Sequence, residues 1–101
     1  MRITMIDETF PTLRHFFGAY LNLDWPETYG SPAAAAEAYA IVTPQIRREN
    51  AIAEIDTLIG QRREPKALID FLFELGNEYL LDPLVDDPVD FLNVLRAKIA
   101  M

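Results

Sequence analysis

The 101-residue sequence lacks cysteine entirely and contains only one histidine and one serine. Without cysteine the protein can form neither disulfides nor thiolate metal sites, which fits a reducing cytoplasm. No apolar run approaches the roughly 18 residues that a membrane-spanning helix needs. Residues 1–10 also lack the apolar core and cleavage site of a signal peptide. We therefore expect a cytoplasmic protein that is not inserted in a membrane.

Few residues of the chain are suited to catalysis. His15 has no nearby carboxylate or second ligand in the sequence, so general acid–base and metal roles are poorly supported. Ser31 directly precedes Pro32, which is typical of a helix-capping serine and not of a strained nucleophile turn. We predict that the protein is not an enzyme and that it holds no metal and no cofactor.

Acidic residues outnumber basic ones, and their distribution is uneven. The formal net charge is −7, which argues against nucleic acid as a partner and is compatible with a basic protein. Residues 67–95 contain seven acids and no base, so this stretch alone carries a charge equal to that of the whole chain. The sequence thus predicts an acidic surface formed by its second half.

Half of the residues are apolar and a quarter are charged, as in a single folded domain. Residues 1–9 are expected to form an N-terminal arm and residues 10–101 one small all-α domain of about five short helices. The first predicted helix runs from about Pro11 to about Asn22. The second covers about 33–42 and the third about 44–59. The fourth begins at Pro65, and the fifth runs from Pro88 to about Ile99. No stretch alternates as a buried strand would.

Local signals support these helix boundaries. A capping residue followed by proline occurs at Ser31-Pro32, Thr43-Pro44 and Asp87-Pro88. Glycine 60 and glycine 76 are the expected stops of the third and fourth helices. The helix at 33–42 is apolar nearly all round, so we expect it to be buried between its neighbours.

The stretch from Phe10 to Trp25 carries five of the eleven aromatic residues, most of them on one helical face. Such a stripe should organise the core, because each large ring buries roughly 150–250 Å². Trp25 is expected in the core, and Gly18 is expected where another helix comes close. The predicted core contains Phe16 or Phe17, Tyr20, Ile55, Phe71, Leu72 and Phe91.

The same stretch resembles the opening of the contact-dependent growth inhibition (CDI) immunity proteins. The resemblance rests on Phe10-Pro11-x-Leu13, Phe16-Phe17-Gly18-x-Tyr20 and Asp24-Trp25, and it departs at 21–23, where Leu-Asn-Leu replaces a more polar segment. It implies a small bacterial protein that binds and neutralises a toxin domain delivered by a neighbouring cell. It does not name the toxin.

The acidic second half supplies the candidate binding residues. Asp70, Glu74 and Glu78 follow one another at a spacing of four, and the last two have no base within helical reach. The aspartates at 82–90 have three interpretations. They could form a solvated surface in which some cap a helix, a binding face, or a metal cluster. The candidate toxin-binding residues are Glu74, Glu78, Tyr79, Asp82, Asp86 and Asp87, of which Asp87 could be occupied in capping the last helix.

These observations lead to one favoured function and one alternative. The favoured function is an immunity protein, a monomer or weak homodimer, that covers the basic, nuclease-like active site of its cognate toxin with an acidic face. Nuclease toxins are expected to be basic because they grip phosphates. The alternative is a helical protein–protein interaction or regulatory module with an unrelated partner.

Overall fold

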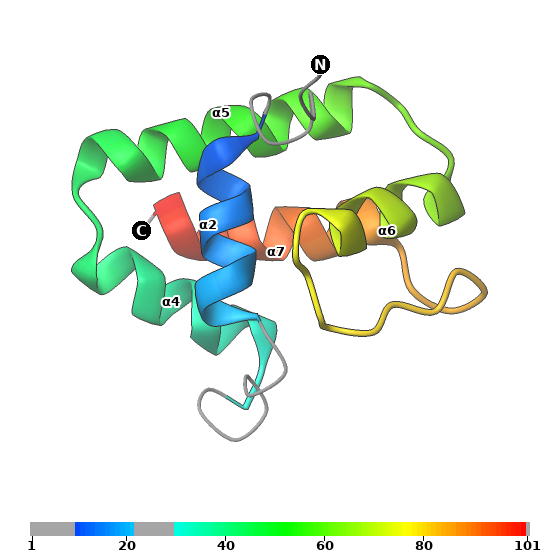
Figure 1. Cartoon of the computed structure of the whole chain (residues 1–101), viewed down its shortest axis with the longest axis horizontal. Coiled ribbons are helices and arrows are strands. Elements are labelled where there is room, and N and C mark those ends of the chain that lie inside the picture. Colours follow the sequence, from blue (N-terminus) through cyan, green and yellow to red (C-terminus); the bar gives the residue numbers. More distant parts are fainter. Residues whose placement is uncertain (1–9, 22–29, 101) are drawn as a thin grey trace, which may run out of the picture.

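The computed structural model describes residues 10–21 and 30–100, which form five α-helices and no strand (Figure 1). The helices are α2 (Pro11–Tyr20), α4 (Pro32–Val42), α5 (Gln45–Gly60), α6 (Pro65–Glu74) and α7 (Pro88–Ala100). The predicted all-α fold is confirmed. The expectations for the arm at 1–9, for Asn22 and for Trp25 concern residues outside the described ranges.

Two of the three predicted capping signals act as expected. The Ser31 hydroxyl accepts a hydrogen bond from the backbone N–H of Ala34 at 3.1 Å and caps α4. Asp87 caps α7 in the same way, because its Oδ1 accepts from the N–H of Val89 at 2.9 Å. Each side chain satisfies one of the free amides of a first helical turn.

The third signal is wrong. Helix α5 begins at Gln45 with Pro44 as its N-cap, and no side chain caps it. Thr43 instead ends α4, and its carbonyl accepts a hydrogen bond from Nε of Arg48 at 3.2 Å. A capping residue must directly precede the first turn, and Pro44 occupies that position here.

Helix α2 receives its N-terminal cap from a distant part of the chain. Its own N-cap residue, Phe10, has no side-chain acceptor. Glu54 of α5 supplies one: its Oε1 accepts from the N–H of Leu13 at 2.9 Å and its Oε2 from the N–H of Thr12 at 3.2 Å. A carboxylate at the positive end of a helix is favourable, so Glu54 both caps α2 and holds it against α5.

Replacing Glu54 by alanine should therefore lower the free energy of unfolding by about 1–2 kcal/mol, as for the loss of a helix cap. Glu49→Ala is the matched control, because the carboxylate of Glu49 lies on the same helix and, among the described residues, accepts a hydrogen bond from the side chain of Gln45 and from no backbone amide. Urea unfolding of both variants measures the difference. Equal stability of the two would show that the distant cap contributes nothing.

The aromatic face of α2 forms one side of the core. Phe10, Phe16 and Phe17 are buried, and the ring of Phe16 lies 5.4 Å from Phe17, 5.7 Å from Tyr20 and 5.0 Å from Tyr39 between centroids. Tyr39 belongs to α4, so these ring contacts join the first two helices. Such edge-on and offset contacts add to the burial of apolar area.

Helix α7 forms the other side of the core. It runs behind α2 in Figure 1 and packs against α4, α5 and α6. Its residues Leu92, Leu95 and Ile99 are fully buried. Two ion pairs join its surface to its neighbours: Arg96 contacts Asp56 of α5 at 2.7 Å, and Lys98 contacts Glu37 of α4 at 2.9 Å.

The predicted core is confirmed with one qualification. Tyr20 is only partly buried and packs at the edge of the core. The other members are all buried: Phe16, Phe17, Ile55, Phe71, Leu72 and Phe91.

The prediction that the helix at 33–42 is buried between its neighbours is wrong for most of the helix. Only Ala35, Ala36 and Tyr39 of α4 are buried. Ile41 and Val42 are exposed, because the C-terminal end of α4 extends to the corner where the chain turns into α5 (Figure 1). An apolar helix end at this corner is left facing solvent.

The interpretation of the glycines also needs correction. A Cβ on Gly18 would meet no atom within 4 Å, so no helix requires a glycine there. The close approach comes from Gly76 in the connector after α6, where a Cβ would lie 3.5 Å from the backbone nitrogen of Gly18 and where φ is +112°. Helix α5 does end at Gly60, but the left-handed residue beyond it is Arg62, with φ of 54°.

Candidate protein interaction surface

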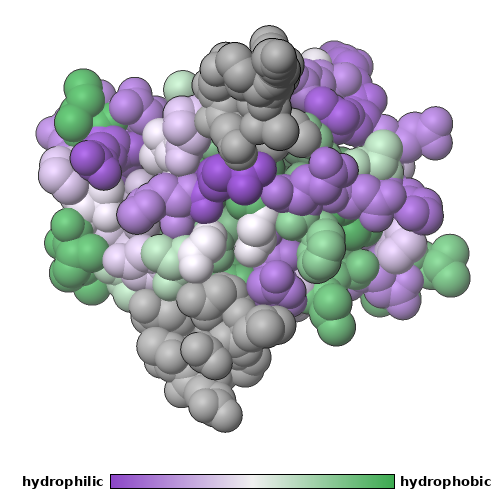
Figure 2. Space-filling view, in the orientation of Figure 1, coloured by the Kyte–Doolittle hydropathy of each residue, from purple (hydrophilic) through white to green (hydrophobic). Residues whose placement is uncertain are grey.

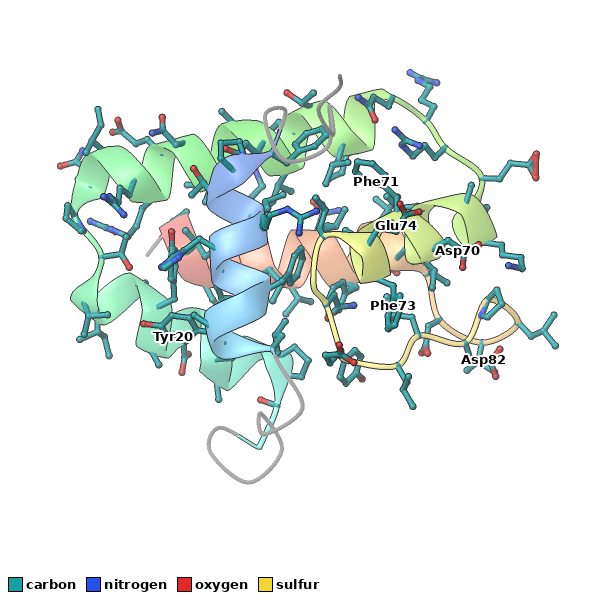
Figure 3. All side chains as sticks on the ribbon, in the orientation of Figure 1. Tyr20, Asp70, Phe71, Phe73, Glu74 and Asp82 are labelled. Carbon is teal, nitrogen blue, oxygen red and sulfur yellow. The ribbon has the colours of Figure 1, made fainter. Side chains whose placement is uncertain are left out.

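The six predicted binding residues lie at the end of α6 and in the connector at 75–87 that leads to α7. Figure 3 labels Glu74 and Asp82 in this part of the molecule, on the side away from the corner between α4 and α5. The structure therefore places the predicted residues in one region. It does not give them equal roles, because their side chains make different contacts.

The acidic side chains of this region form no ion pair with a base of the described chain, although Nη2 of Arg14 donates a hydrogen bond to the backbone carbonyl of Glu74 at 3.1 Å. The ion pairs found in residues 10–21 and 30–100 are Lys66–Asp70, Arg96–Asp56 and Lys98–Glu37. None of them involves the six acids between positions 74 and 90, which are Glu74, Glu78, Asp82, Asp86, Asp87 and Asp90. By contrast, Arg96 hydrogen-bonds to Asp56 and lowers the pKa of that carboxyl group. An uncompensated acidic region attracts a positively charged partner over some distance.

Two of the aspartates fold the connector. Oδ1 of Asp82 accepts from the N–H of Leu84 at 2.9 Å, and Oδ2 of Asp86 accepts from the N–H of Asp82 at 2.9 Å. The N–H of Asp86 in turn donates to the carbonyl of Asp82 at 2.7 Å. Asp82 and Asp86 thus close a tight turn, a role that was not among the three interpretations of these aspartates. A carboxylate can accept several hydrogen bonds, so both keep capacity for a partner.

Asn77 fixes the beginning of the connector. It is the buried polar residue of the described chain, and its amide bonds both backbone groups of Tyr79: Nδ2 donates to the carbonyl and Oδ1 accepts from the N–H, each at 3.1 Å. The next residue, Glu78, donates its N–H to the carbonyl of Leu21 at the end of α2 at 2.9 Å. The connector is thereby fixed internally and attached to the end of α2.

A groove of about 430 Å³ lies between the connector, the start of α4 and α7. The ring of Tyr79 stacks on Phe91 with a centroid distance of 5.4 Å and an interplanar angle of 3°. Asp86, Asp87 and Asp90 contribute the acidic residues of the groove. Of the six predicted residues, Tyr79, Asp86 and Asp87 meet here, whereas the lining does not include the other three.

Large aliphatic side chains project from the same connector. Leu80, Leu84 and Val85 are 85%, 93% and 80% exposed, and we call these three residues the aliphatic ridge. Figure 2 shows apolar atoms (green) among hydrophilic ones (purple) over this half of the molecule, where Figure 3 places Phe73. The prediction considered only charged and aromatic residues. Leucines in an irregular acidic stretch were the signal that would have found the ridge.

A second exposed apolar area lies beside basic residues, whereas the aliphatic ridge lies among acidic ones. Ile41, Val42 and Ile46 are exposed at the corner between α4 and α5, next in sequence to Arg47 and Arg48. We call these three aliphatic residues the α4–α5 corner. It lies at the other end of the molecule from the ridge (Figure 1).

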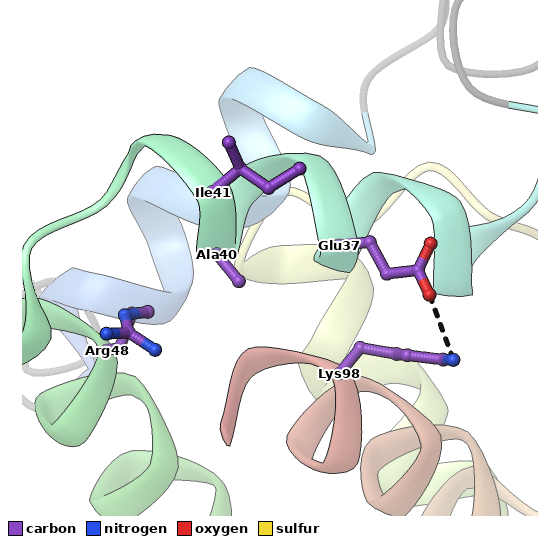
Figure 4. A pocket seen from close by; sticks show the side chains of 5 residues that line it. All are labelled: Glu37, Ala40, Ile41, Arg48 and Lys98. Atoms are coloured by element: carbon purple, nitrogen blue, oxygen red, sulfur yellow. Dashed lines mark ion pairs between the residues drawn. The ribbon is translucent and has the colours of Figure 1, made fainter. Parts of the chain in front are cut away.

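The pocket beside this corner shows no arrangement suited to catalysis. It has a volume of about 420 Å³ and is lined by Glu37, Ala40, Ile41, Arg48 and Lys98 (Figure 4). Its acid and its lysine form an ion pair at 2.9 Å, and its arginine donates to the carbonyl of Thr43. The charged groups are therefore already partnered within the protein.

The residues weighed for catalysis remain separate from one another. His15 is exposed on α2, and Ser31 is occupied as the cap of α4. Over residues 10–21 and 30–100, no group of three or more metal-ligating side chains comes together. Burial raises the pKa of Tyr39, which fits its position in the core and not a role as a base. No helix in the described ranges is long and apolar enough to cross a membrane.

The described residues form a small all-α protein with exposed acidic and aliphatic side chains. A family model described as CdiI immunity protein matches residues 9–99. The chain therefore belongs to the CdiI immunity protein family and is a toxin-neutralising immunity protein that binds a cognate toxin. This class typically inhibits by binding and not by catalysis. No curated protein and no solved structure gave a match.

Proposed function

We propose that this protein neutralises its toxin by covering a basic, nucleic-acid-cleaving active site with the acidic surface of α6 and the following connector. The observation that supports this most directly is the absence of an ion pair for any acid from Glu74 to Asp90 within the described chain, whereas Glu37, Asp56 and Asp70 each pair with a base. The candidate contact residues are Glu74, Glu78, Tyr79, Asp82, Asp86 and Asp87.

The chemistry of a nuclease makes such a surface an effective inhibitor. An enzyme that cleaves nucleic acid arranges lysine and arginine side chains around the positions of the phosphates. Carboxylates presented at those positions form charge-assisted hydrogen bonds with the same side chains. The inhibitor then occupies the site without resembling a nucleotide in any other respect.

The acids of this surface contribute in two ways. Glu74 is exposed and its side chain makes no hydrogen bond among the described residues, so it is free to meet the toxin. Asp82, Asp86 and Asp87 already accept backbone hydrogen bonds, so they present charge from fixed positions. Fixed charges steer a partner and set its orientation, which mainly raises the association rate.

The double variant Glu74→Lys/Glu78→Lys should bind the toxin domain with an association rate about 10-fold lower at low salt and with a weaker dependence on salt. Glu49→Lys/Glu64→Lys, which introduces the same charge change away from this surface, is the control. Stopped-flow mixing with the toxin domain at several salt concentrations measures both quantities. Identical rates and salt dependence in the two variants would show that the acidic surface is only solvated.

A further inference from the structure

The aliphatic ridge is not explained by the proposal that acidic residues cover a basic active site. Its members are among the eight large apolar residues that are exposed in the described chain, and all three lie within six consecutive positions. Scattered exposed leucines are ordinary, but an apolar cluster rimmed by polar groups is typical of a protein interaction site. Leu84, at 93% exposed, contributes almost nothing to the fold.

The backbone beneath the ridge is held in place by side chains. Asp82 and Asp86 close the turn that carries Leu84 and Val85, and Asn77 fixes the backbone at Tyr79, directly before Leu80. Ordering a loop before binding removes an entropy cost from the complex. A connector that only joined two helices would not need hydrogen bonds that hold exposed apolar side chains in fixed positions.

We propose that the aliphatic ridge is the anchor that holds the toxin and that it inserts into an apolar depression ringed by lysine or arginine side chains on the toxin domain. This inference rests on the proposed function and deepens it by naming the part of the surface that determines the lifetime of the complex. An apolar centre with a polar rim is the usual anatomy of a protein interface.

The groove next to the ridge supports this partner chemistry. Val85 belongs to the ridge and also lines the groove, whose other apolar lining includes Val94 and the stacked ring of Tyr79. Asp86 and Asp87 stand at the junction of the two. The apolar surface is thus continuous from ridge to groove and is bordered by negative charge, so its complement is apolar with a positive border.

The α4–α5 corner does not fit the same partner. It exposes aliphatic residues to a similar degree, with Ile41 at 83% and Ile46 at 66%, but Arg47 and Arg48 adjoin it in sequence. A basic toxin surface would be repelled there. The same kind of aliphatic substitution can therefore be made at the corner as a control, and it should leave toxin binding unchanged.

The test compares Leu80→Ser/Leu84→Ser with the control Ile41→Ser/Ile46→Ser. Both are assayed by surface plasmon resonance against the purified toxin domain encoded by the neighbouring reading frame. The ridge variant should dissociate at least about 100-fold faster, with an association rate within about threefold of the unaltered protein, because buried apolar contacts act mainly on dissociation. The control should change neither rate by more than about threefold. Leu84→Met, which keeps an apolar side chain, should retain most of the lifetime.

The outcomes separate this inference from the proposed function. Thermal unfolding should be the same for all variants, since the altered side chains are exposed. If the unaltered protein failed to bind the toxin domain, both the proposed function and the anchor would be overturned. If it bound and the ridge variant dissociated no faster, the anchor alone would be wrong. If only the corner variant dissociated faster, the proposal that the aliphatic ridge is the anchor would also be wrong.

Discussion

Phe16→Ala should lower the free energy of unfolding by about 3–5 kcal/mol, the usual cost of removing a buried phenylalanine ring. Phe16 is fully buried on α2, and its ring contacts three other aromatic rings: Phe17, Tyr20 and Tyr39. The substitution leaves a cavity between α2 and α4 and removes the contact of Phe16 with Tyr39, while the contact between Tyr20 and Tyr39 remains. Natural domains have only about 5–15 kcal/mol in total, so the variant should be close to unfolding at physiological temperature.

Urea unfolding followed by circular dichroism measures this effect. Phe73→Ala is the control, since Phe73 of α6 is 58% exposed and the chemical change is identical. We expect the control to cost less than about 1 kcal/mol, as for most surface substitutions. Similar losses in the two variants would mean that the ring cluster of Phe16 is not the centre of the core.

Asn77→Ala should lower the free energy of unfolding by about 2–3 kcal/mol, because the partly buried backbone groups of Tyr79 lose these two hydrogen bonds. Both of the side chain's hydrogen bonds, one donated and one accepted, go to this single residue. The substitution should also loosen the connector that carries the ridge, so toxin dissociation should become faster together with the loss of stability.

Hydrogen exchange distinguishes these two effects. In Asn77→Ala the amide of Tyr79 should lose protection beyond what the global loss of stability explains. Asn93→Ala, an exposed asparagine on α7, is the control and should change neither stability nor exchange in the connector. A connector amide that remained protected in Asn77→Ala would show that other contacts hold it.

The features that the sequence predicted correctly depend on neighbouring residues. Helix periodicity, a serine or aspartate before a proline, and the aromatic stripe all act over a few positions, so Ser31, Asp87 and the stripe from Phe10 could be interpreted directly. The burial of Phe71, Leu72 and Phe91 followed because each belongs to the apolar stripe of its helix.

The features that the sequence did not reveal depend on distant parts of the chain. Glu54 caps α2 across 41 or 42 positions, and no local pattern marks a glutamate in mid-helix as a cap. The exposure of Ile41 follows from where α4 ends relative to its neighbours. Periodicity gives the face of a helix but not the length over which another element covers it.

The sequence located the acidic region that we propose as the site, but it did not predict the contacts within that region. The run of acids from Glu74 to Asp87 identified the region, because composition shows where charge is concentrated. It could not show that Asp82 and Asp86 bind backbone amides of their own turn, since that depends on the course of the connector. The connector's course also decides that Leu84 faces solvent.

The position of α7 has a consequence for how the protein is made. Helices α4, α5 and α6 all precede α7 in the chain, and each of them packs against it. On the ribosome, those three helices emerge before the helix that covers them has been synthesised, so their apolar faces stay accessible to chaperones. The core therefore cannot be complete until the buried residues of α7 have left the exit tunnel.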